Sequence, residues 1–582
     1  MASADYFLAF FLLFAASGLF LWLLGAAVFY RSLGMESIFR APWLGYALLV
    51  GLLQLGHLFF PINGSFSRSL LAVTSGLAFL ALLLGGFRAR WTRRSYVAAS
   101  LVLVLLAVIS LLTFVPAFNC GTKEMFHYDL GLYYLKTIRW TESLPIVRGL
   151  VNVQPHLGFN QSAFLVTSFL DSLVPNRMGL SLIGGILPWL GLSLSLFAMV
   201  RIALLRFLSN ESAPPIEVAY AISTPAWVFA LVGGNVTSAS PDSVSTCLMI
   251  HLFLVFACLV ISAQEEEWNR NFGEVLVIGA LSLCVKLSSV GLVVGIWIVA
   301  AVLYYRRRYQ MPRRILVMAG LSTLLLGTLL WRGIVLSGYP FFPSTALAMP
   351  VEWRMPRKEA REFYGLTVWC ARDPEFEGSR KRALKTWKWL PHWWERVLGA
   401  RAQFAWPLQV GIMGSATFAL VAAVGGGALR KSAFCLALLV APVFLNVAIW
   451  FFTAPDPRYL GSSLWLFAIC PALVFVAGSP QLGPLVGIAN LCASAVPLFF
   501  LAWDFRWNWS YPEPRLPTFK TVELSWAPSD HGVTVWFPVQ GDQTFDGPIP
   551  SSKGPRPDLA YIDPERGMEA GFKYLKVKNP SQ

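Results

Sequence analysis

Apolar runs of about 20 residues dominate the sequence, with polar segments between them. An α-helix rises about 1.5 Å per residue, so a run of this length is sufficient to cross the hydrocarbon core of a bilayer. Hydrophobic residues make up 56% of the 582 positions and charged residues only 13%, whereas about a quarter of the residues in soluble domains are charged. The sequence therefore predicts an all-α, polytopic membrane bundle.

We count about fourteen transmembrane helices in these runs. The segment 273–305 fits either two of them or one long tilted helix, and this choice changes the parity of the topology. The shorter apolar stretch 161–175 is predicted as an interfacial or re-entrant helix, because it is too short to cross comfortably. The predicted crossings are 6–30, 42–60, 69–87, 96–116, 179–205, 217–234, 242–263, 273–288, 290–305, 313–336, 407–427, 432–452, 459–477 and 483–503.

Short loops rich in arginine orient the bundle, because such loops stay on the cytoplasmic side of a membrane. Three basic loops of this kind lie at 88–94, 306–314 and 430–431. They place four segments on the outer face: 117–178, 337–406, 454–458 and 504–582.

The composition changes after Trp503. The stretches TVELSW and GVTVWFPV alternate in the manner of strands, and HGV, QGDQ and FDGP between them have turn chemistry. We therefore predict two parts. Residues 1–503 form the helical bundle with outer loops 117–178 and 337–406, and residues 504–582 form a small β-rich extracytoplasmic domain.

The segment 126–160 keeps several ionisable residues between two apolar regions. Ionisable groups are costly in hydrocarbon, so a cluster of them beside the membrane is where chemistry is expected. Asp129 begins a helical stretch there, and its carboxylate could take a proton from an acceptor hydroxyl. The alternative is that Asp129 caps this helix by satisfying its free N–H groups.

A second candidate is the run PDPRYL, which holds Asp456, Arg458 and Tyr459 in a tight turn before the crossing 459–477. An arginine in this position can bind a phosphate through two charge-assisted hydrogen bonds. Alternatively, Arg458 snorkels to lipid head groups beside an interfacial tyrosine. The sequence leaves both interpretations open.

Two cations lie inside apolar runs, where an unpaired charge costs several kcal/mol. Lys286 precedes a serine-rich break that could face a cavity, and Arg332 lies about one turn from the outer boundary. Asp242 follows Ser240 and Pro241 at the start of a crossing, and this order is typical of a helix start.

Several other functions find little support in the sequence. No run alternates basic and aromatic residues as a nucleic-acid site would, so no nucleic-acid partner is expected. Cysteine spacing gives no metal site, and His156 has no ligand at a suitable spacing. Cys120 and Cys370 lie in predicted loops and pair only if both face an oxidising compartment.

This layout resembles the GT-C class of membrane-embedded glycosyltransferases, in which a multi-span bundle carries a long first external loop with an essential acid. The stretch DLGLYYLKTIRWTESLPIVRGLVNVQPHLGFNQSAF also looks like the corresponding loop of a large bacterial membrane family with that layout. Later landmarks are similar too: SGYPFFPS, VEWRMP, PDPRYL and GVTVWFPVQGDQTFDGP. One departure is that many GT-C enzymes pair two acids in this loop, whereas Asp129 is followed by Leu130 and Gly131.

The resemblance implies an enzyme of the bacterial inner membrane that moves a sugar from a polyprenyl-phosphate donor to a glycan, lipid or protein acceptor on the outer face. Membrane lipids are its surroundings, and we expect no required cofactor and little dependence on a divalent metal. The alternatives are a polysaccharide polymerase or ligase and a non-enzymatic lipid or glycan transporter.

Site roles follow from that implied reaction. Asp129 is predicted as the catalytic base, and Arg458, Lys286 and Arg332 are predicted to bind the donor phosphate. Contacts with the acceptor or within the loop are predicted for His127, Tyr133, Arg139, His156 and Tyr459.

Overall fold

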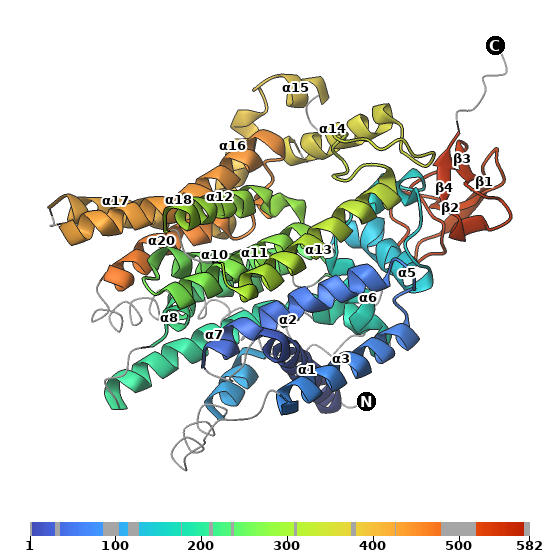
Figure 1. Ribbon diagram of the computed structural model, residues 1–582. Helices are drawn as coiled ribbons and strands as arrows, with labels where there is room; N and C mark the ends of the chain where they lie inside the picture. The colour runs from blue at the N-terminus through green and yellow to red at the C-terminus, as the bar shows by residue number, and fades with distance from the viewer. Residues whose placement is uncertain are drawn as a thin grey trace.

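The structure is a computed structural model of the chain, and it is largely helical (Figure 1). It describes residues 3–29, 35–84, 104–114, 127–175, 177–208, 213–233, 238–307, 311–373, 380–424, 427–478 and 520–575. The predicted crossing 483–503, the arginine loop 88–94 and Cys120 lie outside these residues.

The apolar helices form the body of the molecule. They are α1 (Ser3–Phe29), α2 (Met35–Gly56), α3 (Gly64–Leu84), α7 (Gly179–Leu208), α8 (Pro215–Ile222), α9 (Thr224–Gly233), α10 (Pro241–Ile261), α11 (Glu265–Val285), α12 (Val290–Arg307), α13 (Arg313–Ser337), α17 (Trp406–Val424), α18 (Gly427–Thr453) and α20 (Ser463–Gly478). Shorter helices are α5 (Leu135–Ser143), α6 (Ala163–Leu173), α14 (Arg357–Arg372), α15 (Arg380–Lys385), α16 (Leu390–Gly399) and α19 (Pro457–Leu460).

Within the described residues, seven helices contain a stretch long and apolar enough to cross a membrane. This confirms the predicted helical bundle with apolar helices of membrane-spanning length, whereas the count of fourteen crossings stays a prediction. The seven stretches are Ala9–Phe29, Met35–Gly56, Leu182–Leu204, Pro241–Ile261, Leu287–Arg307, Arg313–Ser337 and Ser432–Thr453.

The structure decides between the two alternatives for 273–305 and divides one predicted crossing. The segment 273–305 forms two helices, because α11 ends where Lys286 adopts an extended backbone before the 3₁₀ turn Leu287–Ser289. The crossing predicted at 217–234 is divided into α8 and α9 at Ser223. Pro225 follows this break and has no N–H to give to the carbonyl of Ala221, which instead accepts a hydrogen bond from the Thr224 hydroxyl at 2.9 Å.

Helices α1 and α2 are in backbone contact through two glycines. A Cβ atom on Gly25 would lie 1.9 Å from the carbonyl oxygen of Ala41, and one on Gly45 would lie 1.9 Å from that of Leu21. Small residues permit such close approach between apolar helices, where van der Waals packing drives association. The N-terminal helix pair therefore depends on these two positions.

A charged network lies in the core of the bundle and joins α2, α10 and α11. Arg40 donates to Glu274 at 2.5 Å, and the other Glu274 oxygen lies 2.9 Å from His251 Nε2. His251 in turn lies 2.8 Å from the Tyr220 hydroxyl of α8. All four side chains are almost fully buried. Burial of the Arg40 and Glu274 charges costs desolvation free energy, and their ion pair offsets this cost.

The C-terminal segment forms a small β-rich unit, as predicted for this region. Strand β1 (Leu524–Pro528) pairs antiparallel with β2 (Thr534–Pro538), and β3 (Leu559–Tyr561) pairs antiparallel with β4 (Phe572–Tyr574). Figure 1 shows the strands gathered at one end of the bundle, beside α5. Phe572 of β4 packs edge-on against Trp140 of α5, with ring centroids 5.8 Å apart.

Candidate functional site

A cavity of about 330 Å³ opens where several helix ends meet the connecting segments. Polar residues line one part of it, and aliphatic and aromatic residues line the rest. Its walls come from the start of α10, the break between α11 and α12, the C-terminal halves of α13 and α18, and the middle of α14. The connecting segments that complete it are 129–134, 158–161, 340–343 and 454–459.

Asp129 lies in this cavity, directly before a π-helical turn at Leu130–Tyr134. Its carboxylate accepts hydrogen bonds from Arg458 Nη1 and from the Tyr134 hydroxyl, each at 3.4 Å. The side chain makes no capping hydrogen bond, so the capping interpretation of Asp129 is wrong. The carboxylate instead faces side chains that come from other parts of the chain.

Arg458 reaches Asp129 from α19, whose start is fixed by Asp456. The Asp456 carboxylate accepts from the Arg458 backbone N–H at 2.9 Å and from Nε at 3.4 Å. Arg458 Nη1 also lies 3.4 Å from His127 Nε2. The guanidinium therefore turns into the cavity, where it is 35% exposed, and the snorkelling interpretation does not describe this geometry.

His127 completes the polar corner around Arg458. Its ring stacks on Tyr134, with centroids 5.7 Å apart. Burial lowers the pKa of His127, Arg458 and Lys286 lower it further, and only Asp129 opposes them. The imidazole is therefore neutral near pH 7, and its Nε2 can accept a hydrogen bond from Arg458.

A second pair of opposite charges lies in the same cavity. Lys286 forms an ion pair with Asp242, and its ammonium lies 4.7 Å from the centre of the Tyr459 ring. The helix start of α10 is capped by Ser240, whose hydroxyl accepts from the Asp242 N–H at 3.2 Å. The Asp242 carboxylate thus pairs with Lys286 instead of serving only the helix start, and the sequence interpretation missed this role.

Two tryptophans hold the turn that carries Arg458. Trp393 of α16 donates its indole N–H to the carbonyl of Pro455 at 2.5 Å, and Trp450 of α18 donates to the carbonyl of Asp456 at 2.7 Å. Their rings contact each other, with centroids 5.7 Å apart. Sequence reasoning did not find these residues, because a tryptophan at a helix end is equally typical of a membrane interface.

Tyr133 and Tyr459 line the cavity, whereas His156 is not part of its lining. The predicted contacts of these three residues with the acceptor or within the loop stay predictions. The His156 ring stacks on Tyr133, with centroids 5.1 Å apart, and contacts Phe363 edge-on. Burial lowers the pKa of His156 to about 4, so this imidazole is neutral and supports an aromatic wall. In the described part of the chain no three His, Cys, Asp or Glu residues converge as metal ligands, and the expected lack of metal dependence stays a prediction.

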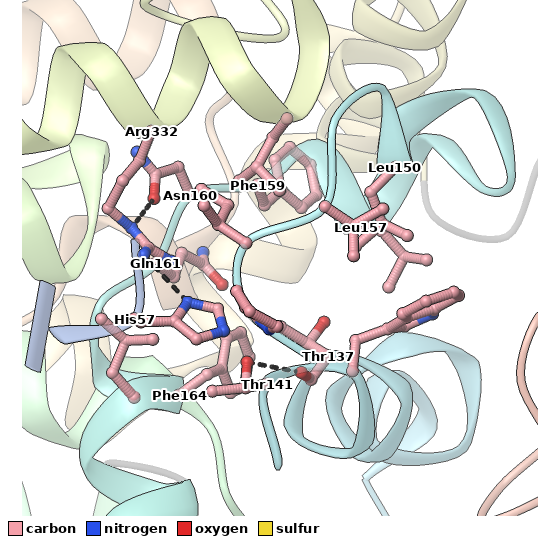
Figure 2. Close-up of a pocket in the computed structure, with 16 residues that line it drawn as sticks. His57, Thr137, Thr141, Leu150, Leu157, Phe159, Asn160, Gln161, Phe164 and Arg332 are labelled. Carbon is pink, nitrogen blue, oxygen red and sulfur yellow. Dashed lines mark hydrogen bonds between the residues drawn. The ribbon is translucent and has the colours of Figure 1, made fainter. Parts of the chain in front are cut away.

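Arg332 does not line this cavity, although it was predicted to bind the same phosphate. It lies beside a second cavity of about 30 Å³, shown in Figure 2, where Nε donates to Asn160 at 3.2 Å and Nη1 donates to His57 at 3.0 Å. The segment Phe159, Asn160 and Gln161 borders both cavities. Arg332 therefore lines the smaller cavity, whereas Asp129 lines the larger one.

Arg139 also points away from the cavity. Its guanidinium donates to the backbone carbonyls of Asp546 at 2.6 Å and Gly547 at 2.9 Å. Arg139 therefore contacts the C-terminal β-rich unit, and its predicted contact with the acceptor or within the loop stays a prediction.

Glu142, the next acid after Asp129, belongs to a separate cluster. Arg177 Nη1 lies 2.8 Å from Glu142 and 2.5 Å from Asp171, and Arg177 Nη2 lies 3.2 Å from Asp546. Three carboxylates thus share one guanidinium. Burial raises the pKa of Glu142 to about 7, although the charge of Arg177 opposes this shift.

The raised pKa of Glu142 predicts a loss of stability as the pH rises from about 4.5 to about 7. In that window the folded protein keeps a proton that the unfolded chain has released, so unfolding becomes easier with increasing pH. Relative to Glu142→Gln, the wild type should lose on the order of 3 kcal/mol between pH 5 and pH 8. Thermal unfolding in detergent micelles would measure this difference.

A suitable control is Glu395→Gln, which changes an exposed glutamate on α16 and should keep the wild-type pH dependence. Equal pH slopes for Glu142→Gln and the wild type would show that Glu142 is ionised throughout this range.

Comparison with known proteins places the cavity within a protein family. A family model described as a domain of unknown function (DUF8201) matches residues 6–465. The chain belongs to this family. Every residue that lines the larger cavity lies within the matched region, whereas the four C-terminal strands follow it. No curated protein and no solved structure matches the chain.

Proposed function

We propose that this protein is a membrane glycosyltransferase of GT-C layout, which moves a sugar from a polyprenyl-phosphate carrier to a glycan, lipid or protein acceptor on the outer face of the bacterial inner membrane. The observation that carries the proposal is the meeting of Asp129 and Arg458, 3.4 Å apart, in one cavity. An acid beside a cation in one cavity suits a reaction in which one substrate loses a proton and the other releases a phosphate.

The lining of the cavity supports a donor that is part lipid and part phosphate. Arg458 and Lys286 bring two positive charges to its polar part. Leu329 of α13 and Ile449 of α18 border its apolar part, together with Val290 of α12. A polyprenyl chain could lie against the apolar side chains while its phosphate reaches the cations.

In the proposed step, Asp129 removes the proton of an acceptor hydroxyl. The acceptor oxygen then forms a bond to the anomeric carbon of the sugar, and the bond from that carbon to the phosphate oxygen breaks. The electron pair remains on the phosphate, whose added negative charge Arg458 and Lys286 stabilise. Attack opposite the leaving group inverts the anomeric configuration.

The contact between Asp129 and Arg458 gives this step an order. In the free protein the Arg458 guanidinium donates a hydrogen bond to the Asp129 carboxylate, which must accept the proton. A donor phosphate offers Arg458 stronger, bidentate hydrogen bonds. We therefore expect donor binding to draw Arg458 from Asp129 and to leave the carboxylate available to the acceptor.

The membrane position belongs to the same proposal. The seven apolar helices support a membrane protein, and the segments predicted to lie outside, 117–178, 337–406 and 454–458, each contribute residues to the one cavity. The count of fourteen crossings, the outward orientation of the cavity and its lipid-linked substrate are inferences from the sequence pattern.

Arg458→Ala should weaken the binding of polyprenyl phosphate by roughly 10–100-fold, because hydrogen bonds to a charged group contribute about 1.5–3 kcal/mol. Arg458→Lys should recover part of this loss, since lysine restores the charge but not the bidentate geometry. Binding can be measured in detergent micelles with polyprenyl phosphate alone as the probe.

The matched control is Arg566→Ala, which removes an exposed arginine from the C-terminal unit and should bind the probe as the wild type does. Wild-type affinity in Arg458→Ala would overturn the assignment of this residue to the donor phosphate.

A further inference from the structure

A segment of the C-terminal unit lies against the turn that carries Asp129. We call residues 542–547, with the sequence DQTFDG, the C-terminal hook. The backbone N–H groups of Thr544 and Phe545 both donate to the carbonyl of Gly131, at 3.1 and 3.0 Å. Gly131 is part of the π-helical turn, and the hook thus supplies two hydrogen bonds to one carbonyl of that turn.

Further contacts hold the chain on both sides of Asp129. Before it, the Tyr128 hydroxyl donates to Asp542 at 2.5 Å, and the Gln543 amide donates to the Tyr128 carbonyl at 2.6 Å. After it, Lys136 donates to the Gly547 carbonyl at 2.9 Å. The hook therefore contacts residues that flank Asp129 in the sequence, whereas the carboxylate itself accepts from Arg458 and Tyr134.

The Phe545 ring fills the space above Gly131. A Cβ atom on Gly131 would lie 2.8 Å from two carbons of this ring, so the contact requires the absence of a side chain at that position. Phe545 adopts a φ of 43°, which is an uncommon conformation for a bulky residue and costs about 1–3 kcal/mol. The surrounding hydrogen bonds and the packing of the ring offset this cost.

The position of the turn determines where the Asp129 carboxylate meets its partners. Tyr134, the last residue of the turn, donates to Asp129 and lies 3.3 Å from the Ser240 hydroxyl of α10. Arg458 approaches from a separate element, α19. A shift of the turn against the bundle would therefore change the distance from Asp129 to Arg458.

We propose that the C-terminal hook positions Asp129 for its role in the cavity, by fixing the π-helical turn through the Gly131 carbonyl and the Phe545 ring. The catalytic consequence rests on the function proposed above, whereas the fixing of the turn does not. The hook lies outside the region that the family model matches.

Three variants test this proposal: Gly131→Ala, Phe545→Ala and the double variant. In Gly131→Ala the new methyl group collides with the ring and displaces the turn, whereas in the double variant the ring is absent. Hydrogen exchange of the amides of residues 127–139 in the purified full-length protein should increase at least tenfold in Gly131→Ala. Exchange in the double variant should equal that of Phe545→Ala, because the two changes act through one contact.

Transfer kinetics give the second measurement. A displacement of about 1 Å can cost about 10²-fold in rate, so Gly131→Ala should lower kcat by roughly this factor while KM for the donor changes little, because Arg458 remains in place. Trp526→Ala, a change of an exposed residue on β1, is the control and should leave both measurements unchanged.

The two measurements separate the hook from the proposed reaction. Increased exchange in Gly131→Ala supports the proposal that the hook fixes the turn, even if the wild type transfers no sugar. In that case only the proposed function is contradicted. Unchanged exchange in both Gly131→Ala and Phe545→Ala would overturn the proposal that the hook fixes the turn. If exchange increases in Gly131→Ala but its kcat equals that of the wild type, the hook does not position Asp129 for the reaction. The proposed transfer by the wild type is not contradicted by that result.

Discussion

Asp129→Asn should lower the rate of sugar transfer by about 10²–10⁴-fold, which is the usual contribution of a general base. The amide keeps an oxygen that can accept hydrogen bonds from Arg458 and Tyr134, but it cannot take a proton from the acceptor. Folding should be unaffected, because the side chain of Asp129 caps no helix. The measurement is transfer from a polyprenyl-phosphate sugar by the purified variant, with thermal unfolding as the check on its fold.

The same chemical change at Asp530 provides a control, because this aspartate is exposed in the turn between β1 and β2. Asp530→Asn should retain full activity. Full activity in Asp129→Asn as well would remove Asp129 from the reaction and leave the cavity without an assigned base.

Glu274→Gln should lower the free energy of unfolding by a large amount, on the order of 3–5 kcal/mol. The substitution removes the charge of Glu274 that pairs with Arg40, at a site where both side chains are almost inaccessible to solvent. It also weakens the contact with His251. Thermal unfolding in detergent micelles would detect a loss of this size directly.

Glu36→Gln is the matched control for this prediction. Glu36 pairs with Arg270 at the same 2.5 Å, but the two side chains are 25% and 23% exposed. Solvent screens this partly exposed pair more than it screens the buried one, so this variant should lose less stability than Glu274→Gln. Equal losses in the two variants would mean that burial does not determine the strength of these pairs.

Local sequence pattern was sufficient to predict much of the fold. The apolar runs predict long helices, and the alternation in TVELSW and GVTVWFPV predicts strands where β1 and β2 are found. The cost of a charge in an apolar run indicates that Lys286 could face a cavity, and Lys286 lines the larger cavity. Each of these inferences depends on residues close in sequence or on a requirement that any fold must meet.

The arrangement of the site depends instead on contacts between distant segments. Asp129 and Arg458 are 329 positions apart, and no periodicity within either segment specifies that they meet. The same reason explains why the sequence does not reveal the partners of Arg332 and Arg139, which are Asn160 and the carbonyl of Gly547. A positive charge near the outer end of a helix does not reveal the direction in which it points.

The distance along the chain between Asp129 and Arg458 also has a consequence for biosynthesis. At about 5–20 residues per second, the ribosome adds Arg458 roughly 15–70 s after Asp129, and the C-terminal hook emerges later still. Throughout that interval the nascent bundle carries the acid without its cation and without the segment that fixes its turn. The contact between Asp129 and Arg458 can therefore form only after both segments have been synthesised.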